Sequence, residues 1–177
     1  VYKRQAYYYG KSKEKNIDLG KEHIIDVNGY KLKSIPNDRG ISLELLKFNT
    51  HEPLSTKLIS QELKKGMVCL DLGGNIGYYT LLESKIVGEE GKIISVEPSP
   101  QNYHYLKENL DMQNISNVET YNFACGDIDG EINFLISKNS NTCRTISDDE
   151  PIPKNQKIIK VHIKKLDTFL EENPLPR

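Results

Sequence analysis

An acidic residue and a cluster of glycines lie together at the end of an apolar segment. Asp71 lies near the end of the segment 67–72, and the residues that follow include Gly73, Gly74 and Gly77. Glycines let a backbone approach a ligand closely, and a helix that follows such a turn presents amide donors at its positive end. We therefore expect a ligand-binding turn between a buried strand and a helix.

Two further carboxylates are expected at the ends of the next two strands. Glu97 ends the apolar segment 92–97, and Asp127 follows Gly126 just beyond the segment 118–124. A carboxylate in the place of Glu97 can accept both hydroxyl protons of a ribose, and each charge-assisted bond contributes about 1.5–3 kcal/mol. Asp127 is expected to accept a hydrogen bond from the exocyclic amine of an adenine. Because ligands of parallel sheets bind at the carboxyl ends of the strands, the three acids predict an adenosine site.

The kind of adenosine cofactor follows from Asp71 and from the spacing of the glycines. A carboxylate beside the turn would repel a pyrophosphate but would attract the ammonium group of a methionine moiety. The turn reads Gly-Gly-Asn-Ile-Gly, which is not the G-x-G-x-x-G spacing of nicotinamide-binding proteins, and no G-x-x-x-x-G-K-[ST] phosphate loop occurs. The sequence therefore predicts S-adenosylmethionine as the cofactor.

The expected cofactor-binding residues are Asp71, Gly73, Gly74, Asn75, Gly77, Tyr78, Glu97, Pro98, Ser99, Gly126 and Asp127. Each feature also has a simpler explanation. The glycines could form only a tight connection, Glu97 could cap the next helix, and Asp127 could belong to a turn with Asp129 and Gly130. We favour the cofactor site, because three acids at three successive strand ends are hard to attribute to turns alone.

The apolar pattern places these residues in an α/β fold. The expected elements are strands at 67–72, 92–97 and 118–124, and helices at 78–87 and from Pro100 onward with Ser99 as N-cap. Short connections and right-handed crossovers would make them one half of a doubly wound parallel sheet. Strands at 131–137 and 157–163, joined by a polar loop, are expected to pair antiparallel as an insertion, and a short helix is expected at 166–170.

The region before the first parallel strand predicts an extension. Asn28-Gly29 between alternating apolar segments is typical of a β-hairpin over residues 23–35. A short helix is expected at 42–48 with Ser42 as a possible N-cap, and another at 54–64 that Gly66 ends. Together the elements predict a Rossmann-like, three-layer α/β/α fold with an N-terminal hairpin and helix extension, an antiparallel insertion and an incomplete sheet.

Composition limits the classes of protein. A chain of 177 residues with 37% hydrophobic residues suits one domain, and a net charge of −1 gives no overall field for nucleic acid. The three cysteines have no paired spacing, so neither a disulfide framework nor a metal site is expected. No apolar segment is long enough for a membrane span, and we expect a cytoplasmic protein.

We expect three parts in the chain. Residues 1–22 form a leader that is disordered or not native, residues 23–66 form the hairpin and helices, and residues 67–177 form an S-adenosylmethionine-binding half domain. The first five residues look like translated linker. The end at Arg177 interrupts the pattern, so we expect a C-terminally truncated fragment that could be inactive alone.

Several of these segments resemble the FkbM family of class I methyltransferases. The main ones are Val68–Thr80 (VCLDLGGNIGYYT), Val96–Pro100 (VEPSP) and Asn122–Asp127 (NFACGD), and weaker likenesses are Glu52-Pro53, the turn 39–42 and the segment 165–170. The resemblance covers about residues 24–172. Gly74, where the family usually has alanine, is expected to be a mild departure.

The resemblance implies a Rossmann-like sheet, S-adenosylmethionine as methyl donor and O-methylation of a sugar, lipid or natural-product hydroxyl. The acceptor would be a small molecule or a glycan. An alcohol acceptor needs a base near the reacting oxygen, and His51 and Glu52 are the best local candidates, although a structural role is favoured for both.

Two alternatives stay open. An RNA methyltransferase would need a basic face, for which only the N-terminal lysines offer support, so a nucleic-acid partner is not expected. A non-catalytic fragment that binds an adenosine nucleotide is the other alternative.

Overall fold

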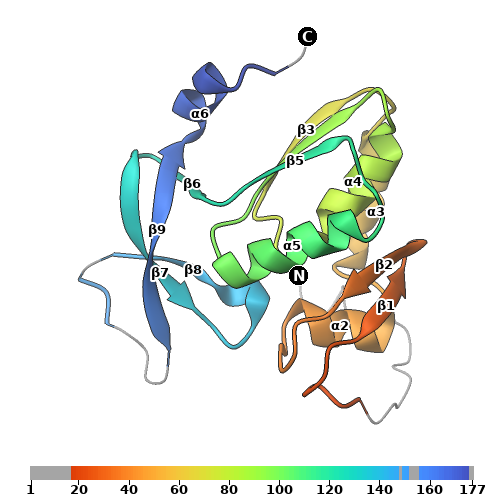
Figure 1. Ribbon diagram of the computed structural model, residues 1–177, viewed down its shortest axis with the longest axis horizontal. Coiled ribbons are helices and arrows are strands. Elements are labelled where there is room, and N and C mark those ends of the chain that lie inside the picture. The colour runs from red at the N-terminus through yellow and green to blue at the C-terminus, as the bar shows by residue number, and fades with distance from the viewer. Residues whose placement is uncertain (1–16, 148, 152–155, 176–177) are drawn as a thin grey trace.

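The computed structural model describes residues 17–147, 149–151 and 156–175 (Figure 1). Most of the expected leader, residues 1–16, therefore lies outside the described residues. The chain begins with the hairpin strands β1 (Ile24–Val27) and β2 (Tyr30–Lys33), followed by the helices α2 (Ile41–Phe48) and α3 (Pro53–Glu62). The hairpin is confirmed: Asn28 and Gly29 both have positive φ angles, 55° and 81°, as its two-residue turn requires.

The expected parallel sheet is confirmed. Its strands are β3 (Val68–Leu72), β4 (Lys92–Val96) and β5 (Val118–Tyr121), in the spatial order β3-β4-β5. The helices α4 (Tyr78–Val87) and α5 (Pro100–Asp111) connect them. In the described part of the chain β3 pairs only with β4, so it lies at an edge, where Leu72 is 50% exposed.

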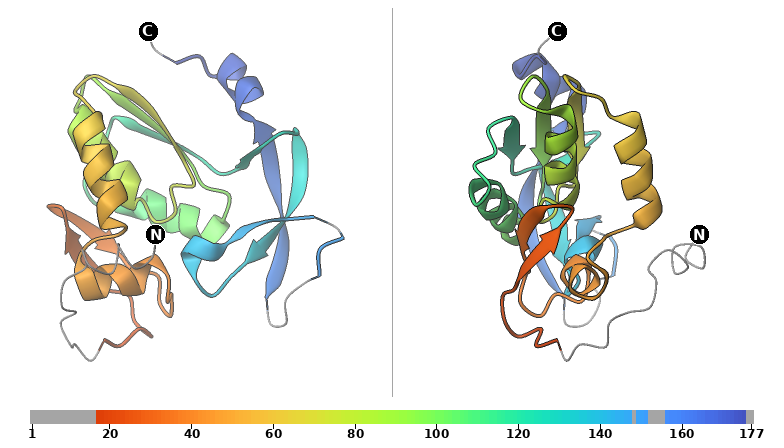
Figure 2. Two further views of the ribbon diagram at one scale, coloured as in Figure 1. Left: turned by 180° about the vertical axis from the view of Figure 1, so that it is seen from behind. Right: turned by 90° about the vertical axis from the view of Figure 1, so that its right-hand side faces the viewer.

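A second sheet has the order β6-β9-β7-β8 and lies to one side of the first (Figures 1 and 2). Its strands are β6 (Ala124–Gly126), β7 (Gly130–Ile136), β8 (Arg144–Ile146) and β9 (Lys157–Lys165), with a 3-10 helix η1 (Ser140–Thr142) between β7 and β8. The antiparallel pairing of β7 with β9 is confirmed. The polar loop expected between them additionally contains η1 and β8.

The expected single strand 118–124 is wrong. The chain leaves the first sheet after Tyr121, and β6 joins the second sheet parallel to β9. Two side chains account for the break. Asn122 donates from Nδ2 to the carbonyl oxygens of Glu97 and Pro98, at 2.7 and 3.2 Å, and Phe123 turns into an apolar cluster where it is only 7% exposed.

Helices and apolar side chains cover both faces of the parallel sheet, which confirms the three-layer fold. On one side the hairpin, α2, α4 and α5 share one cluster that includes Leu32, Leu45, Leu81 and Leu106. On the other side α6 (Leu166–Glu172) brings Phe169 against residues of β4 and β5. The N-terminal extension therefore packs into the same core as the cofactor-binding segment.

Two local predictions about helices need correction. Ser42 does not cap α2, which begins at Ile41; instead the Asp38 carboxylate accepts the backbone amides of Gly40 and Ser42, at 2.8 and 2.9 Å. The helix expected at 54–64 is present as α3, but none of its residues is buried, and Leu58 is 57% exposed. The predicted cap of α5 is confirmed, because Ser99 Oγ accepts the amide of Asn102. None of the helices in the described ranges is long and apolar enough to cross a membrane.

The shared core predicts a large difference between two leucines. Leu106 on α5 is fully buried and Leu58 on α3 is mostly exposed. We expect Leu106→Ala to lower the free energy of unfolding by about 2–5 kcal/mol, because it removes methylene groups and leaves a cavity. Leu58→Ala, the matched control, should change it by no more than about 0.5 kcal/mol. Urea denaturation of both variants measures this, and equal losses would contradict the core described above.

Candidate functional site

The glycine turn between β3 and α4 is held by its own amides. The amides of Gly73 and Gly74 donate to the carbonyl oxygen of Val96, at 2.7 and 3.1 Å, and Gly77 donates to Gly74 at 2.8 Å. Gly73 and Gly77 have φ angles of 100° and 93°, which favour glycine. The turn is thus tied to the end of β4 by the amides of Gly73 and Gly74.

Gly74 is required by close packing. A Cβ atom there would lie 2.2 Å from Ser95 Oγ and 3.2 Å from Thr80 Oγ1. Glycine in place of the alanine usual in the FkbM family therefore has a packing reason in this chain, and the expectation that it does not harm cofactor binding stays a prediction. By contrast, a Cβ on Gly73 would meet no atom within 4 Å, so the space above Gly73 is open.

Glu97 is the best-held carboxylate of the site. It follows β4, is only 4% exposed, and accepts the amides of Asn75 at Oε2 and Ser99 at Oε1, both at 2.8 Å. The side-chain amide of Asn102 adds a third donor, at 3.4 Å from Oε1. Burial nevertheless raises the pKa of Glu97 to about 7, with Asp71 contributing in the same direction and the three donors opposing it.

These bonds limit what Glu97 can still accept. A carboxylate offers about four acceptor positions, and three are used. The remaining acceptor position of Glu97 can take one ribose hydroxyl. The predicted hydrogen bonds to both hydroxyls would require one of the three existing donors to be replaced. Pro98 lies between Glu97 and the capping residue Ser99, and it positions them without a side-chain donor.

Asp71 lies beneath the turn and is surrounded by hydroxyl groups. Its Oδ2 accepts the hydroxyls of Thr80 on α4 and Ser95 on β4, the latter at 3.2 Å. Burial raises the pKa of Asp71, and the two hydroxyl donors oppose this only in part. These contacts face the interior of the fold, so the predicted contact with a methionine ammonium group has no support from the side-chain contacts of Asp71.

A second acid, Glu83 on α4, lies near Asp71. Burial and the negative charge of Asp71 raise the pKa of Glu83 to about 8. Its Oε2 is buried and has no hydrogen-bond partner among the described residues. The two carboxylates therefore destabilise each other whenever both are ionised.

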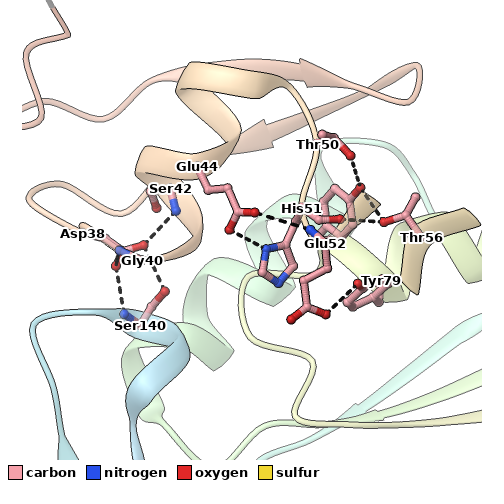
Figure 3. A network of polar contacts seen from close by, with 11 residues as sticks. Asp38, Gly40, Ser42, Glu44, Thr50, His51, Glu52, Thr56, Tyr79 and Ser140 are labelled. Atoms are coloured by element: carbon pink, nitrogen blue, oxygen red, sulfur yellow. Dashed lines mark hydrogen bonds and ion pairs between the residues drawn. The ribbon is translucent and has the colours of Figure 1, made fainter. Parts of the chain in front are cut away.

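The candidate base residues His51 and Glu52 belong to one polar network (Figure 3), and Tyr78 joins it through Thr56. Tyr78 is 2% exposed, and its hydroxyl lies 3.0 Å from Thr56 Oγ1 and 3.3 Å from Thr50 Oγ1. Its side chain thus fixes the start of α4 to the N-terminal extension and does not open toward the glycine turn. His51 Nδ1 lies 2.7 Å from Glu44 Oε2, and Glu52 accepts the hydroxyl of Tyr79 at 3.1 Å.

Gly126 and Asp127 are not at the end of the third parallel strand. Gly126 ends β6, in the second sheet, and Asp127 follows it and is exposed. A Cβ on Gly126 would lie 2.5 Å from Ile163 Cδ1, so this glycine serves the packing of β6 on β9. The residue that does follow β5 beside Glu97 is Asn122.

Sequence reasoning missed four polar residues that position the acids: Thr80, Ser95, Asn102 and Asn122. Only Asn102 had a local signal, because it lies three residues after the predicted N-cap Ser99 and so within the first turn of α5. The others depend on pairing between strands and helices, for which spacing along the chain carries no signal. In the described part of the chain no group of acidic, histidine or cysteine side chains could hold a metal ion.

The residues present fit an adenosine cofactor with a polar tail. Asn75 has a left-handed backbone, with φ 51°, and its buried Oδ1 has no hydrogen-bond partner among the described residues. An unpaired buried acceptor next to Glu97, below the open space at Gly73, suits the hydroxyl or ammonium donors of such a ligand. Asn75, Glu97 and the backbone at Gly73 are the parts of the site that remain consistent with the prediction.

The glycine turn, the three-stranded parallel sheet and the carboxylate after β4 place the chain among the class I methyltransferase folds. The chain belongs to the protein-L-isoaspartate(D-aspartate) O-methyltransferase family, whose family model matches residues 39–131. Membership of this methyltransferase family confirms the predicted enzyme class and the predicted cofactor, S-adenosylmethionine.

Individual relatives match over shorter stretches. A protein-L-isoaspartate O-methyltransferase from Thermotoga maritima is 42% identical over 65 residues, which are 37% of this chain and 20% of the relative. One from Methanococcus maripaludis is 36% identical over 58 residues, 33% of this chain and 27% of the relative. The aligned regions span 20% to 54% of the curated relatives' lengths.

A solved structure gives a similar partial overlap. A SAM-dependent methyltransferase from Aquifex aeolicus is 31% identical, covers 40% of this chain and 36% of its own, and has a TM-score of 0.35.

The assignment to the FkbM family is wrong. The matching family model and both isoaspartate methyltransferase relatives place the chain in a different methyltransferase family. The main motifs behind that assignment, from Val68 to Asp127, surround the glycine turn and Glu97, and they fall within the matched range 39–131.

The acid pair beneath the turn predicts a stability that falls as pH rises. The folded-state pKa of Glu83, about 8, lies above its ordinary value of 4.5, so folding takes up a proton between these values. The loss of folding stability caused by ionised Glu83 is absent below pH 4.5, grows between pH 4.5 and 8, and is complete above pH 8. Glu83→Gln should therefore stabilise the protein at pH 8.5 by on the order of 1 kcal/mol and have a smaller effect at pH 5. Thermal unfolding at both pH values tests this; an equal effect at both would contradict it.

Proposed function

We propose that this chain is the cofactor-binding part of an S-adenosylmethionine-dependent methyltransferase that esterifies the free α-carboxylate of isoaspartyl residues in proteins. The observation that carries the cofactor site is the buried carboxylate of Glu97, held by two backbone amides beside the glycine turn. Family membership over residues 39–131 supports the acceptor class. The isoaspartyl carboxylate replaces, as the proposed acceptor, the sugar, lipid or natural-product hydroxyl that the sequence suggested.

The proposed binding residues are those that can still accept a hydrogen bond or that leave space for a ligand. Glu97 has one acceptor position for a ribose hydroxyl, Asn75 Oδ1 can accept a further donor, and the open space at Gly73 admits the ligand close to the backbone. Bound S-adenosylmethionine supplies an electrophilic methyl group on a sulfonium. The chain contributes position and exclusion of water, which dominate the catalysis of an in-line displacement.

A carboxylate acceptor also explains why no free base is needed. It is already an anion at neutral pH, whereas an alcohol must lose a proton during the reaction. Of the two candidate bases, His51 is bonded to Glu44, and Glu52 accepts the Tyr79 hydroxyl. Their contacts support a structural role at the junction between α3 and α4.

The cofactor site is tested by Glu97→Gln. This variant keeps the size of the side chain but loses the charge and places an NH2 donor against one of the two amides, that of Asn75 or that of Ser99. We expect about 10- to 100-fold weaker binding of S-adenosylhomocysteine by calorimetric titration. Glu131→Gln, on the exposed side of β7, is the matched control and should bind as the parent does. Unchanged affinity in Glu97→Gln would refute the site.

The acceptor is tested with a pair of peptides that differ only in an isoaspartyl or an aspartyl residue at one position. With methyl-labelled S-adenosylmethionine, we expect label to enter only the isoaspartyl peptide. The label should be released by mild alkali, because a methyl ester hydrolyses and a methyl ether does not. Alkali-stable label, or equal labelling of both peptides, would exclude the proposed acceptor.

A further inference from the structure

A chain of buried hydrogen bonds joins the N-terminal extension to Glu97. Asp38, Ser140, Asn102 and Glu97 are 2%, 7%, 3% and 4% exposed, so the chain is shielded from water along its length. They come from the loop before α2, from η1, from α5 and from the end of β4. Three parts of the sequence therefore meet in one polar contact.

Asp38 is satisfied by four donors. Its Oδ1 accepts the amides of Gly40 and Ser140, both at 2.8 Å, and its Oδ2 accepts the amide of Ser42 and the hydroxyl of Ser140, both at 2.9 Å (Figure 3). A buried carboxylate with this many donors holds its partners rigidly, because each unmade bond would leave a desolvated charge. Asp38 therefore fixes Ser140 through two bonds, across 102 residues of sequence.

Ser140 in turn orients Asn102. The carbonyl oxygen of Ser140 accepts from Asn102 Nδ2 at 3.2 Å, and the same nitrogen donates to Glu97 Oε1 at 3.4 Å. An amide nitrogen carries two hydrogens, so both bonds can be made at once. If the carbonyl oxygen of Ser140 were displaced, the amide of Asn102 would be free to rotate away from Glu97.

We propose that Asp38 is a positioning residue for cofactor binding, which acts on Glu97 through Ser140 and Asn102. The inference rests on the proposed role of Glu97 in holding the cofactor. It assigns the N-terminal extension a function beyond core packing. The loop at Asp38 keeps the hydrogen-bond donor of Glu97 in place without contacting Glu97 itself.

The charged and titratable groups around Glu97 give this role a pH signature. Burial and the nearby Asp71 raise the pKa of Glu97, and the Asn102 bond lowers it. Burial raises the pKa of the nearby Cys143 thiol, and the negative charges of Glu97 and Asp38 act in the same direction. Loss of the Asn102 bond therefore moves the pKa of Glu97 further upward, so less of it is ionised at neutral pH. Cofactor affinity should fall most near pH 7 and recover as the pH rises.

The test is calorimetric titration with S-adenosylhomocysteine between pH 6 and 9. Asp38→Asn places an NH2 donor against the backbone amides that the carboxylate accepts. We expect about 3- to 10-fold weaker binding of S-adenosylhomocysteine at pH 7, and the pH at which affinity is half-maximal should shift upward. Asp26→Asn, an exposed acid of the same extension, is the matched control and should change neither. A merely structural role for Asp38 would lower affinity equally at every pH, which would overturn the proposal.

A double-mutant cycle with Asn102→Ala tests the route. Because Asp38 acts through Asn102, Asp38→Asn should weaken binding by less than twofold once Asn102 is already alanine. Additive losses would overturn the proposal. If Asp38→Asn does not fold, Ser140→Ala replaces it in the cycle, since it removes one of the two bonds by which Asp38 holds the segment that carries the Ser140 carbonyl. Normal binding in all of these variants, with weak binding in Glu97→Gln, would reject the role of Asp38 alone; normal binding in Glu97→Gln would reject the cofactor site itself.

Discussion

The structure around the site depends on keeping one buried carboxylate, Glu97, surrounded by donors. Removing a charge from water is costly unless hydrogen bonds replace the lost hydration. Two backbone amides and one side-chain amide do this, and they come from the glycine turn and from the first turn of α5. The turn must therefore lie against the end of β4, and the bonds from Gly73 and Gly74 to Val96 hold it there. The left-handed conformation of Asn75 follows from the same need, since it directs the amide at Glu97.

Asp71 and Glu83 are held in a different way. Asp71 has hydroxyl donors, and one oxygen of Glu83 has no hydrogen-bond partner in the described part of the chain, so burial raises the pKa of both acids. Hydroxyl groups can rotate, whereas the amides around Glu97 are fixed by the backbone. Natural proteins tolerate such unfavourable pairs near functional sites, where stability is not the only requirement. The crowding at Gly74 belongs to the same region, because the hydroxyls that bind Asp71 fill the space where a Cβ would lie.

What could be predicted from the sequence was local. The hairpin at Asn28-Gly29, the glycine turn and the cap at Ser99 each depend on residues close together in the chain. The break between β5 and β6 could not be predicted, because it depends on Asn122 reaching the carbonyl of Glu97 and on Phe123 meeting Phe169. Alternating apolar residues look the same whether a strand continues or changes sheet, so Asp127 was placed at the wrong strand end.

The site shows the same limit. An acid after an apolar segment, such as Glu97, is visible in the sequence. The hydroxyl partners of Asp71, Thr80 and Ser95, are not, because they lie on two other elements. Asp38 had no signal at all, since Ser140 is brought to it only by the second sheet.

The cofactor side and the acceptor side of a methyltransferase are specified by different kinds of residues. Residues that hold a cofactor lie at strand ends and turns, and families with different acceptors share their pattern. This is why the motifs from Val68 to Asp127 indicated the correct cofactor and the wrong family. The acceptor changes the chemistry asked of the protein, because an alcohol needs a base and a carboxylate does not. For the proposed carboxylate acceptor, the hydrogen bonds of His51 to Glu44 and of Glu52 to Tyr79 would be compatible with catalysis, and these bonds join parts of the extension and α4. The extension contributes to the site instead by holding the donors of Glu97 in place, which is a requirement of the cofactor and not of the acceptor.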